Sequence, residues 1–208
     1  MQHVLLYLHG FNSSPQSHKA RVLYEYMHER GLAEALHIPR IPPQPAAAFA
    51  DLCELYESLA VENRQVAVIG SSLGGFYATA LAQRYDCRAV LINPAVRPAI
   101  LLQRYLGLNT NYYSSETWEL NQAHIQQLRD LDVPRIIRPE CYLLLLQTGD
   151  ETLDYCDALE KYRDCAAIVE QGGSHAFDGF ERHLDTILTF CNVGVLPANG
   201  LDHADAKH

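Results

Sequence analysis

Apolar residues along the chain gather in six short runs, separated by longer segments in which they recur at helical spacing. The runs cover residues 3–9, 36–41, 65–70, 89–93, 142–148 and 166–170. Hydrophobic side chains follow one another within these runs with little alternation, which is typical of parallel strands covered on both faces. The pattern therefore predicts six mainly parallel strands in one sheet.

The segments between these runs have the spacing of amphipathic helices. They cover residues 16–30, 46–62, 73–85, 154–163 and 178–191. Strands that alternate with helices, joined by right-handed crossovers, build a doubly wound domain. We therefore expect an α/β fold with a six-stranded sheet, formed by a single domain over residues 1–192.

Residues 94–139 break this rhythm, because the segment is rich in Leu, Tyr, Asn and Gln and contains no strand-like run. Amphipathic stretches at 99–106 and 114–131 predict two or three helices. An insertion after the fourth strand emerges at the carboxyl edge of the sheet, where open α/β sheets bind ligands. We interpret it as a helical cap over the site; the alternative is an enlarged crossover that serves packing only.

Composition excludes several functional classes. The net charge of −9 offers no basic surface to nucleic acid or to an anionic membrane. Six scattered cysteines without a C-x-x-C pair favour free thiols in a reducing cytoplasm. Ten histidines show no metal-ligand spacing, so we expect neither a metal nor a cofactor.

The two ends of the chain add further expectations. Residues 1–8 lack a basic region and run directly into a strand, which argues against a signal peptide. The longest apolar run, 142–146, is too short to cross a bilayer. Residues 193–208 contain Pro197 and Asn199-Gly200, followed by the charged residues Asp202, Asp205 and Lys207, so we expect a flexible tail. The sequence leaves the oligomeric state open.

The most informative motif is Gly70-Ser71-Ser72-Leu73-Gly74, which follows a β-branched run and precedes a helical pattern. This context of strand, sharp turn and helix is that of the nucleophile elbow of α/β-hydrolases. The two glycines remove Cβ atoms that would collide in so tight a turn, and the turn exposes the Ser72 hydroxyl. The alternative is a glycine-rich turn with an idle serine.

A serine nucleophile needs a base, and the base needs an orienting acid. Both are expected after the serine, in the order acid then histidine. Asp150 follows the fifth predicted strand and His175 follows the sixth, at the same sheet edge as Ser72. His9 and His183 are weaker candidates for the base, because a loop-holding role and a place within the last helix suit them better. For the acid, Glu151 and Asp154 compete with Asp150, although Asp154 suits a helix N-cap.

Ester chemistry also needs two backbone N–H groups aimed at the carbonyl oxygen. One is expected from Leu73, directly after the nucleophile. The other is expected from the loop after the first strand, where Gly10 allows close approach and Phe11 is the natural donor. Asn12 is the second choice, and we also count it among the candidate substrate-binding residues.

Five motifs in this order resemble those of the bacterial YqiA-type esterases, a small branch of the α/β-hydrolases, over residues 3–190. The matching segments are 6–15, 70–75, 93–98, 147–151 and 173–177. The resemblance implies carboxylic-ester hydrolysis with Ser72, Asp150 and His175 as a triad. This chain has Ser174 where the family has Asn before the histidine. Arg97, in the third motif, either binds a substrate carboxylate or pairs with an acid beneath the cap.

Four functions remain to be weighed. The first is a serine esterase that acts on small acyl esters through an acyl-enzyme on Ser72, and the second is an acyl thioesterase with the same triad. A nucleotide-binding domain is disfavoured, because Ser72 stands where the dinucleotide fingerprint needs glycine and no P-loop lysine follows Gly75. A non-catalytic binding protein on this fold is the remaining alternative.

Overall fold

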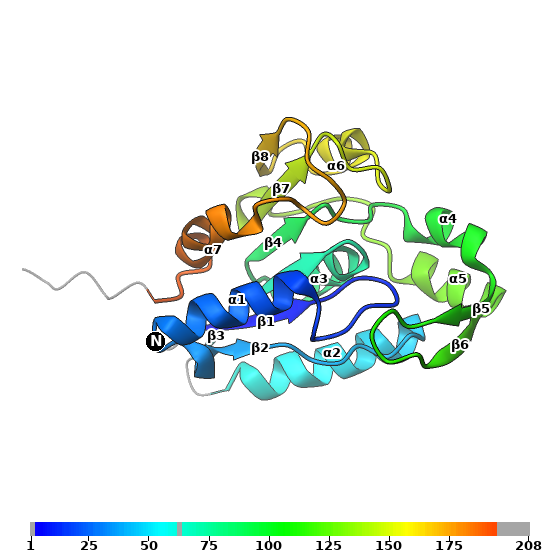
Figure 1. The fold of residues 1–208 in the computed structure, drawn as a ribbon, viewed down its shortest axis with the longest axis horizontal. Helices are drawn as coiled ribbons and strands as arrows, with labels where there is room; N and C mark the ends of the chain where they lie inside the picture. Colours follow the sequence, from blue (N-terminus) through cyan, green and yellow to red (C-terminus); the bar gives the residue numbers. More distant parts are fainter. Residues whose placement is uncertain (1–2, 62–63, 195–208) are drawn as a thin grey trace, which may run out of the picture.

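The computed structural model describes residues 3–61 and 64–194. Within them, six strands pair in the order β2-β1-β3-β4-β7-β8, and every pairing is parallel (Figure 1). The predicted six-stranded parallel sheet is confirmed. The strands are β1 (His3–Leu8), β2 (Leu36–His37), β3 (Gln65–Ser71), β4 (Ala89–Ile92), β7 (Tyr142–Gln147) and β8 (Ala166–Glu170).

Helices cover both faces of the sheet (Figure 1). One face packs against α1 (His18–Glu29) and α7 (Leu184–Phe190). The other packs against α2 (Pro45–Leu59), α3 (Leu73–Tyr85) and α6 (Tyr155–Lys161). The fold is therefore doubly wound, as the alternation of strand-like and helical segments predicts.

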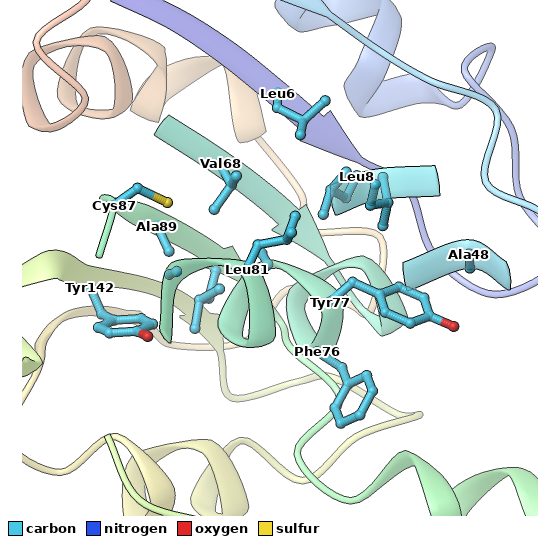
Figure 2. Packing of buried hydrophobic residues seen from close by; sticks show 14 of the residues in the cluster. Leu6, Leu8, Ala48, Val68, Phe76, Tyr77, Leu81, Cys87, Ala89 and Tyr142 are labelled. Carbon is cyan, nitrogen blue, oxygen red and sulfur yellow. The ribbon is translucent and has the colours of Figure 1, made fainter. Parts of the chain in front are cut away.

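Successive side chains of each strand enter opposite cores, as the pleat requires. On β1, Leu6 and Leu8 lie in the core under α3, whereas Leu5 faces α1 and α7. Figure 2 shows Leu81 of α3 among the side chains of β1 and β3. Leu81 is fully buried, and burying a leucine contributes about 2 kcal/mol, so this packing fixes α3 and its first turn on the sheet.

Most predicted boundaries differ from the structure by one to three residues, and three differences have a clear physical meaning. Strand β2 ends at His37 instead of residue 41, because Pro39, Pro42 and Pro43 follow and cannot donate to a ladder. The last predicted helix is divided into a 3₁₀ turn (Phe180–His183) and α7. The tail prediction is wrong at its first residue, because Val193 packs in the core at 3% exposure; residues 195–208 lie outside the described part of the chain.

The insertion is only partly helical. It contains α4 (Pro98–Leu101), a 3₁₀ turn (Leu102–Tyr105) and α5 (Gln122–Asp130). Between these helices lies an antiparallel hairpin, β5 (Gly107–Thr110) and β6 (Thr117–Leu120), although no strand was expected here and β6 lies within the stretch 114–131 that was expected to be helical. Figure 1 shows this hairpin beside the loop that follows β1, so the insertion lies at the carboxyl edge of the sheet.

The described residues contain neither a membrane-spanning helix nor a metal-binding cluster. Across 3–61 and 64–194, no helix combines the length and the apolar character that a membrane span requires. Over these ranges, no group of three or more His, Cys, Asp or Glu side chains is arranged to hold a metal ion. All six cysteines are free thiols.

Candidate active site

Ser72 stands at the sharp turn between β3 and α3, with φ 57° and ψ −121°. Such backbone angles are costly for any residue other than glycine and persist only where the surroundings enforce them. A Cβ on Gly70 would lie less than 3.0 Å from the carbonyl oxygen of Gly74. A Cβ on Gly74 would in turn lie less than 3.0 Å from the carbonyl oxygen of Leu8. Close backbone packing therefore holds the elbow.

The structure brings together the three side chains that the sequence singled out. His175 Nε2 lies 3.0 Å from Ser72 Oγ, and His175 Nδ1 lies 2.8 Å from Asp150 Oδ2. The Asp150 side chain is only 2% exposed, and the other carboxylate oxygen accepts the backbone N–H groups of Thr152 (2.9 Å) and Leu153 (2.8 Å). Serine, imidazole and carboxylate thus form one hydrogen-bonded chain.

The two competing carboxylates have other partners. Asp154 is the N-cap of α6, where it accepts the backbone N–H of Cys156 at 2.9 Å. Glu151 accepts the backbone N–H of His175 at 3.0 Å, and this bond lowers the pKa of Glu151. Neither carboxylate is bonded to the imidazole, so Asp150 is the one that faces His175.

Of the two alternative histidines, His9 is buried, and its Nε2 accepts the backbone N–H of Ile41 at 3.3 Å. His9 Nδ1 is 3.1 Å from the carbonyl of Gly10, and burial lowers the pKa of His9. His183 Nε2 lies 3.0 Å from Glu170. Both rings are occupied by contacts away from Ser72.

Gln147, the last residue of β7, organises the loop that contains His175. We call residues 171–179 the histidine loop. The buried side chain of Gln147 accepts the N–H groups of Ser174 (3.0 Å) and Asp178 (2.8 Å) through Oε1. The Nε2 group donates to Glu170 Oε2 (2.7 Å) and to the carbonyl of Asp178 (2.8 Å). All four hydrogen bonds of the Gln147 side chain are therefore made to the histidine loop or to Glu170, which directly precedes it.

Asn93, at the end of β4, is a second support that sequence reasoning did not find. The side chain donates to the carbonyl of Ser174 at 3.0 Å and accepts the N–H of Gln147 at 3.1 Å. The residue is 3% exposed and has φ 39°. A buried polar residue in the left-handed region at the carboxyl end of a strand is the signal that marks it.

The expected oxyanion donors lie next to the nucleophile. A Cβ on Gly10 would be 3.2 Å from the Cβ of Ser72, so the backbone before Phe11 approaches the serine closely. Leu73 is the first residue of α3, where the N–H groups have no intrahelical partner. Neither the Phe11 nor the Leu73 amide donates to a protein acceptor in the described part of the chain.

Asn12, predicted as a substrate-binding residue, is instead bonded to the insertion. Its side-chain oxygen accepts the indole N–H of Trp118 at 2.8 Å, and its amide nitrogen lies 3.4 Å from Asn109 Oδ1. The backbone carbonyl accepts the N–H of Tyr112 at 2.8 Å. Asn12 thus attaches the loop after β1 to the hairpin.

Arg97 does not lie with the other candidates. The guanidinium pairs with Asp157 of α6 and is more than half exposed. Arg97 lines a separate cavity with residues such as Asp132 and Lys161, and the described cavity that holds Ser72 does not include it. Of the two interpretations of Arg97, the structure favours the ion pair over the substrate contact.

Two cavities meet at Phe11 and Leu73, the expected oxyanion donors. One, of about 510 Å³, is lined by Ser72 and His175 together with Leu101, Tyr105 and Tyr113 of the insertion. The other, of about 590 Å³, is lined by His9, Arg40 and Trp118 among others. Both are bordered by Phe11 and Leu73. The Ser72 hydroxyl therefore faces a space large enough for a small molecule.

Residues 4–192 match the sequence family described as "Uncharacterised protein family (UPF0227)". The chain belongs to the UPF0227 family. The UPF0227 protein YcfP of Salmonella arizonae is 24% identical over 194 residues, which cover 92% of this chain and 100% of YcfP. This match confirms the resemblance drawn from the five motifs.

Solved structures show the same fold as this UPF0227 protein. Mouse alpha/beta hydrolase domain-containing protein 10 is similar with a TM-score of 0.70 at 15% identity, covering 90% of this chain and 89% of the mouse chain. The esterase domain of a Rhodothermus marinus protein is similar with a TM-score of 0.63 at 15% identity, covering 91% and 85%. The fold is the α/β-hydrolase fold.

Proposed function

We propose that this UPF0227 protein is a serine hydrolase that cleaves carboxylic esters of small molecules through an acyl-enzyme on Ser72. The observation that supports this function best is the hydrogen-bonded chain from Ser72 through His175 to the buried Asp150. The order of these residues and their places after β3, β7 and β8 are those of an α/β-hydrolase triad.

Each residue then has a role in two half-reactions. His175 Nε2 accepts the proton of the Ser72 hydroxyl as its oxygen attacks the ester carbonyl, and the resulting oxyanion accepts the N–H groups of Phe11 and Leu73. His175 returns the proton to the leaving alcohol, whose departure leaves the acyl group on Ser72. A water molecule, deprotonated by His175, then attacks this acyl group. The bond between the acyl carbon and Ser72 Oγ breaks, His175 returns the proton to the serine oxygen, and the acid is released.

The third member of the proposed triad, Asp150, acts through His175. Asp150 accepts the Nδ1–H of His175, which leaves Nε2 free to accept the serine proton and stabilises the imidazolium that follows. The backbone N–H groups of Thr152 and Leu153 hold the carboxylate in place. Burial of Asp150 keeps water from competing for the imidazole.

Covalent labelling tests the nucleophile directly. A fluorophosphonate probe is expected to add to the wild-type protein, and trypsin then releases the label on the peptide of residues 65–84, with fragmentation placing it on Ser72. Ser72→Ala is expected to abolish labelling and to lower kcat for 4-nitrophenyl butanoate by about 10⁴-fold or more. Ser58 is an exposed serine of α2, and Ser58→Ala serves as the matched control. This variant is expected to keep both covalent labelling and the wild-type kcat.

The same experiment distinguishes the alternatives. A wild-type protein that neither binds the probe covalently nor hydrolyses the ester would overturn the proposal in favour of a binding protein. A butanoyl thioester compared with its oxygen ester defines the leaving group. A thioester preference above about 100-fold in kcat/KM, after allowance for the uncatalysed rates, would replace the esterase by a thioesterase.

A further inference from the structure

The cavity that contains Ser72 has a polar corner where α1 begins. Ser17, His18 and Lys19 line this cavity together with Ser72 and His175. Ser17 is the N-cap residue of α1, and its side chain makes no capping bond. The proposed mechanism uses none of the three residues from α1, so this corner needs its own explanation.

Lys19 is a cation without a counterion at this corner. The ammonium donates one hydrogen bond, to the carbonyl of Ala176 at 2.7 Å, and forms no ion pair within residues 3–61 and 64–194. Burial lowers the pKa of Lys19 to about 8, an effect that the negative charge of Asp150 opposes. A lysine has three N–H donors, so two remain for a ligand.

Two hydroxyl groups line the same cavity as Lys19. The Ser17 hydroxyl is buried and makes no hydrogen bond of ordinary length and angle among the described residues. Tyr7 is 1% exposed; burial raises its pKa, and interactions of its hydroxyl with those of Ser17 and Ser71 oppose that rise. Buried polar groups are almost always hydrogen-bonded, so a buried hydroxyl without a well-formed bond, in the same cavity as a partly buried ammonium, indicates a ligand position.

We propose that Lys19, Ser17 and Tyr7 form a subsite for a carboxylate, so that the preferred substrates are esters with a free acid group on the acyl or the alcohol part. This inference rests on the proposed esterase function and deepens it. A carboxylate would supply the missing charge to the ammonium and acceptor oxygens to the hydroxyls. Arg104 in the same cavity adds positive charge, whereas Glu151 is bonded to the backbone of His175.

Matched ester pairs measure the preference and locate it. Monomethyl adipate and methyl hexanoate differ in a terminal carboxylate on the acyl side; 5-butanoyloxypentanoate and pentyl butanoate differ in one on the alcohol side. In at least one pair, kcat/KM is expected to be about tenfold to a hundredfold higher for the acidic ester. The pair that shows the preference identifies the side of the scissile bond on which Lys19 acts. Equal values in both pairs would overturn the proposal.

Variants assign the preference to Lys19. Lys19→Gln removes the charge but retains a donor for Ala176, and the ratio of acidic to neutral kcat/KM is expected to fall to about one. The ratio is the readout because a displaced histidine loop slows both esters alike. Arg21→Gln, an exposed residue of the same helix, makes the same charge change and is expected to keep the wild-type ratio. An unchanged ratio in Lys19→Gln would refute the subsite.

Solution pH gives a second readout that a structural role would not move. Lys19 loses its proton as the pH rises through about 8, so the acidic-to-neutral ratio is expected to decline between pH 7 and 9. Lys19→Arg stays charged over this range, and its ratio is expected to remain constant. A decline in both proteins would assign the titration to another group of this cavity and count against Lys19. These groups are Tyr7, His18, Arg104, Tyr105, Tyr112, Tyr113, Asp150, Glu151 and His175.

Binding without hydrolysis separates the subsite from the esterase function. Calorimetric titration of the wild-type protein is expected to show tighter binding of hexanoate than of hexanamide, its neutral analogue, and Lys19→Gln is expected to remove the difference. This result would support the subsite even if no ester were hydrolysed. Equal binding of hexanoate and hexanamide to the wild-type protein would refute it even if esters were cleaved.

Discussion

The elbow that contains Ser72 and the histidine loop that contains His175 position these two side chains by different means. Ser72 is held by backbone packed against backbone, since Gly70, Gly74 and Leu8 leave no room for a single methyl group. His175 is held by side-chain hydrogen bonds, above all those of Gln147 and Asn93. Of the proposed triad, Ser72 is thus fixed by steric exclusion and His175 by polar contacts.

This difference sets how each region responds to substitution. Steric exclusion has no intermediate state, because an added Cβ either fits or displaces the chain. A set of hydrogen bonds can be weakened one by one, and each is worth about 1 kcal/mol net. We therefore expect the elbow to tolerate almost no change, whereas the histidine loop should lose activity in graded steps.

The largest expected effect on kcat comes from replacing Asp150, the carboxylate that is hydrogen-bonded to the imidazole of His175. Asp150→Asn can still accept the N–H groups of Thr152 and Leu153 through its oxygen, but its NH₂ group then faces His175 Nδ1. The imidazole is driven into the tautomer whose Nε2 carries a proton and cannot accept one from Ser72. We expect kcat to fall about 10⁴-fold, which corresponds to about 5.4 kcal/mol, while the urea-unfolding midpoint changes little.

Asp154→Asn is the matched control for that substitution. Asparagine caps a helix nearly as well as aspartate, so kcat for the same ester is expected to stay within about twofold. A protein in which Asp154→Asn is inactive and Asp150→Asn is active would reassign the orienting acid.

The elbow itself is tested by Gly70→Ala. The new Cβ would collide with the carbonyl of Gly74, so we expect the free energy of unfolding to fall by more than about 3 kcal/mol, measured by urea denaturation. Gly31→Ala adds the same methyl at φ 69° with no atom within 4 Å, and is expected to cost only about 1–2 kcal/mol of backbone strain. Similar losses for the two variants would show that collision does not hold the elbow.

Gln147→Leu tests the histidine loop. The substitution removes the acceptor of the Ser174 and Asp178 N–H groups in a buried site, so we expect an unfolding cost of about 2–3 kcal/mol and a kcat about tenfold to a hundredfold lower. Loss of positioning should act on kcat more than on KM. The exposed Gln126→Leu of α5 is the control, and wild-type kinetics for Gln147→Leu would contradict a positioning role.

The smallest effect is expected outside both regions. Arg97 is exposed and paired with Asp157, away from the Ser72 cavity, so Arg97→Gln should leave kcat/KM for both acidic and neutral esters within about twofold. A loss of tenfold or more, confined to acidic esters, would return Arg97 to the substrate site and weaken the assignment of Lys19.

Much of this arrangement was predictable from local sequence. Apolar runs mark the strands because both faces of a parallel sheet are buried, and the positions of Asp150 and His175 follow from strand ends that share one edge. The Gly70–Gly74 motif is local as well, since the turn it forms depends on residues a few positions apart. These features need no knowledge of distant contacts.

Other features depend on contacts between residues far apart in the chain. Gln147 and Asn93 look like ordinary strand ends until the histidine loop is folded over them, 27 and 81 residues away from Ser174. The hairpin β5–β6 was not predicted, and β6 was assigned to a helix, because four-residue strands are too short to show a clear period. Val193 looks like the first residue of the tail, yet its side chain packs in the core after the end of α7.

The attachment of Asn12 to the hairpin has a consequence for protein engineering. Trp118, Asn109 and Tyr112 all bond to the residue that directly follows the proposed oxyanion donor Phe11. An insertion transplanted from another α/β-hydrolase to change substrate range would therefore arrive without the partners that shape residues 9–15. The insertion and residues 9–15 should therefore be exchanged together, and the junctions of a chimaera should lie outside both segments.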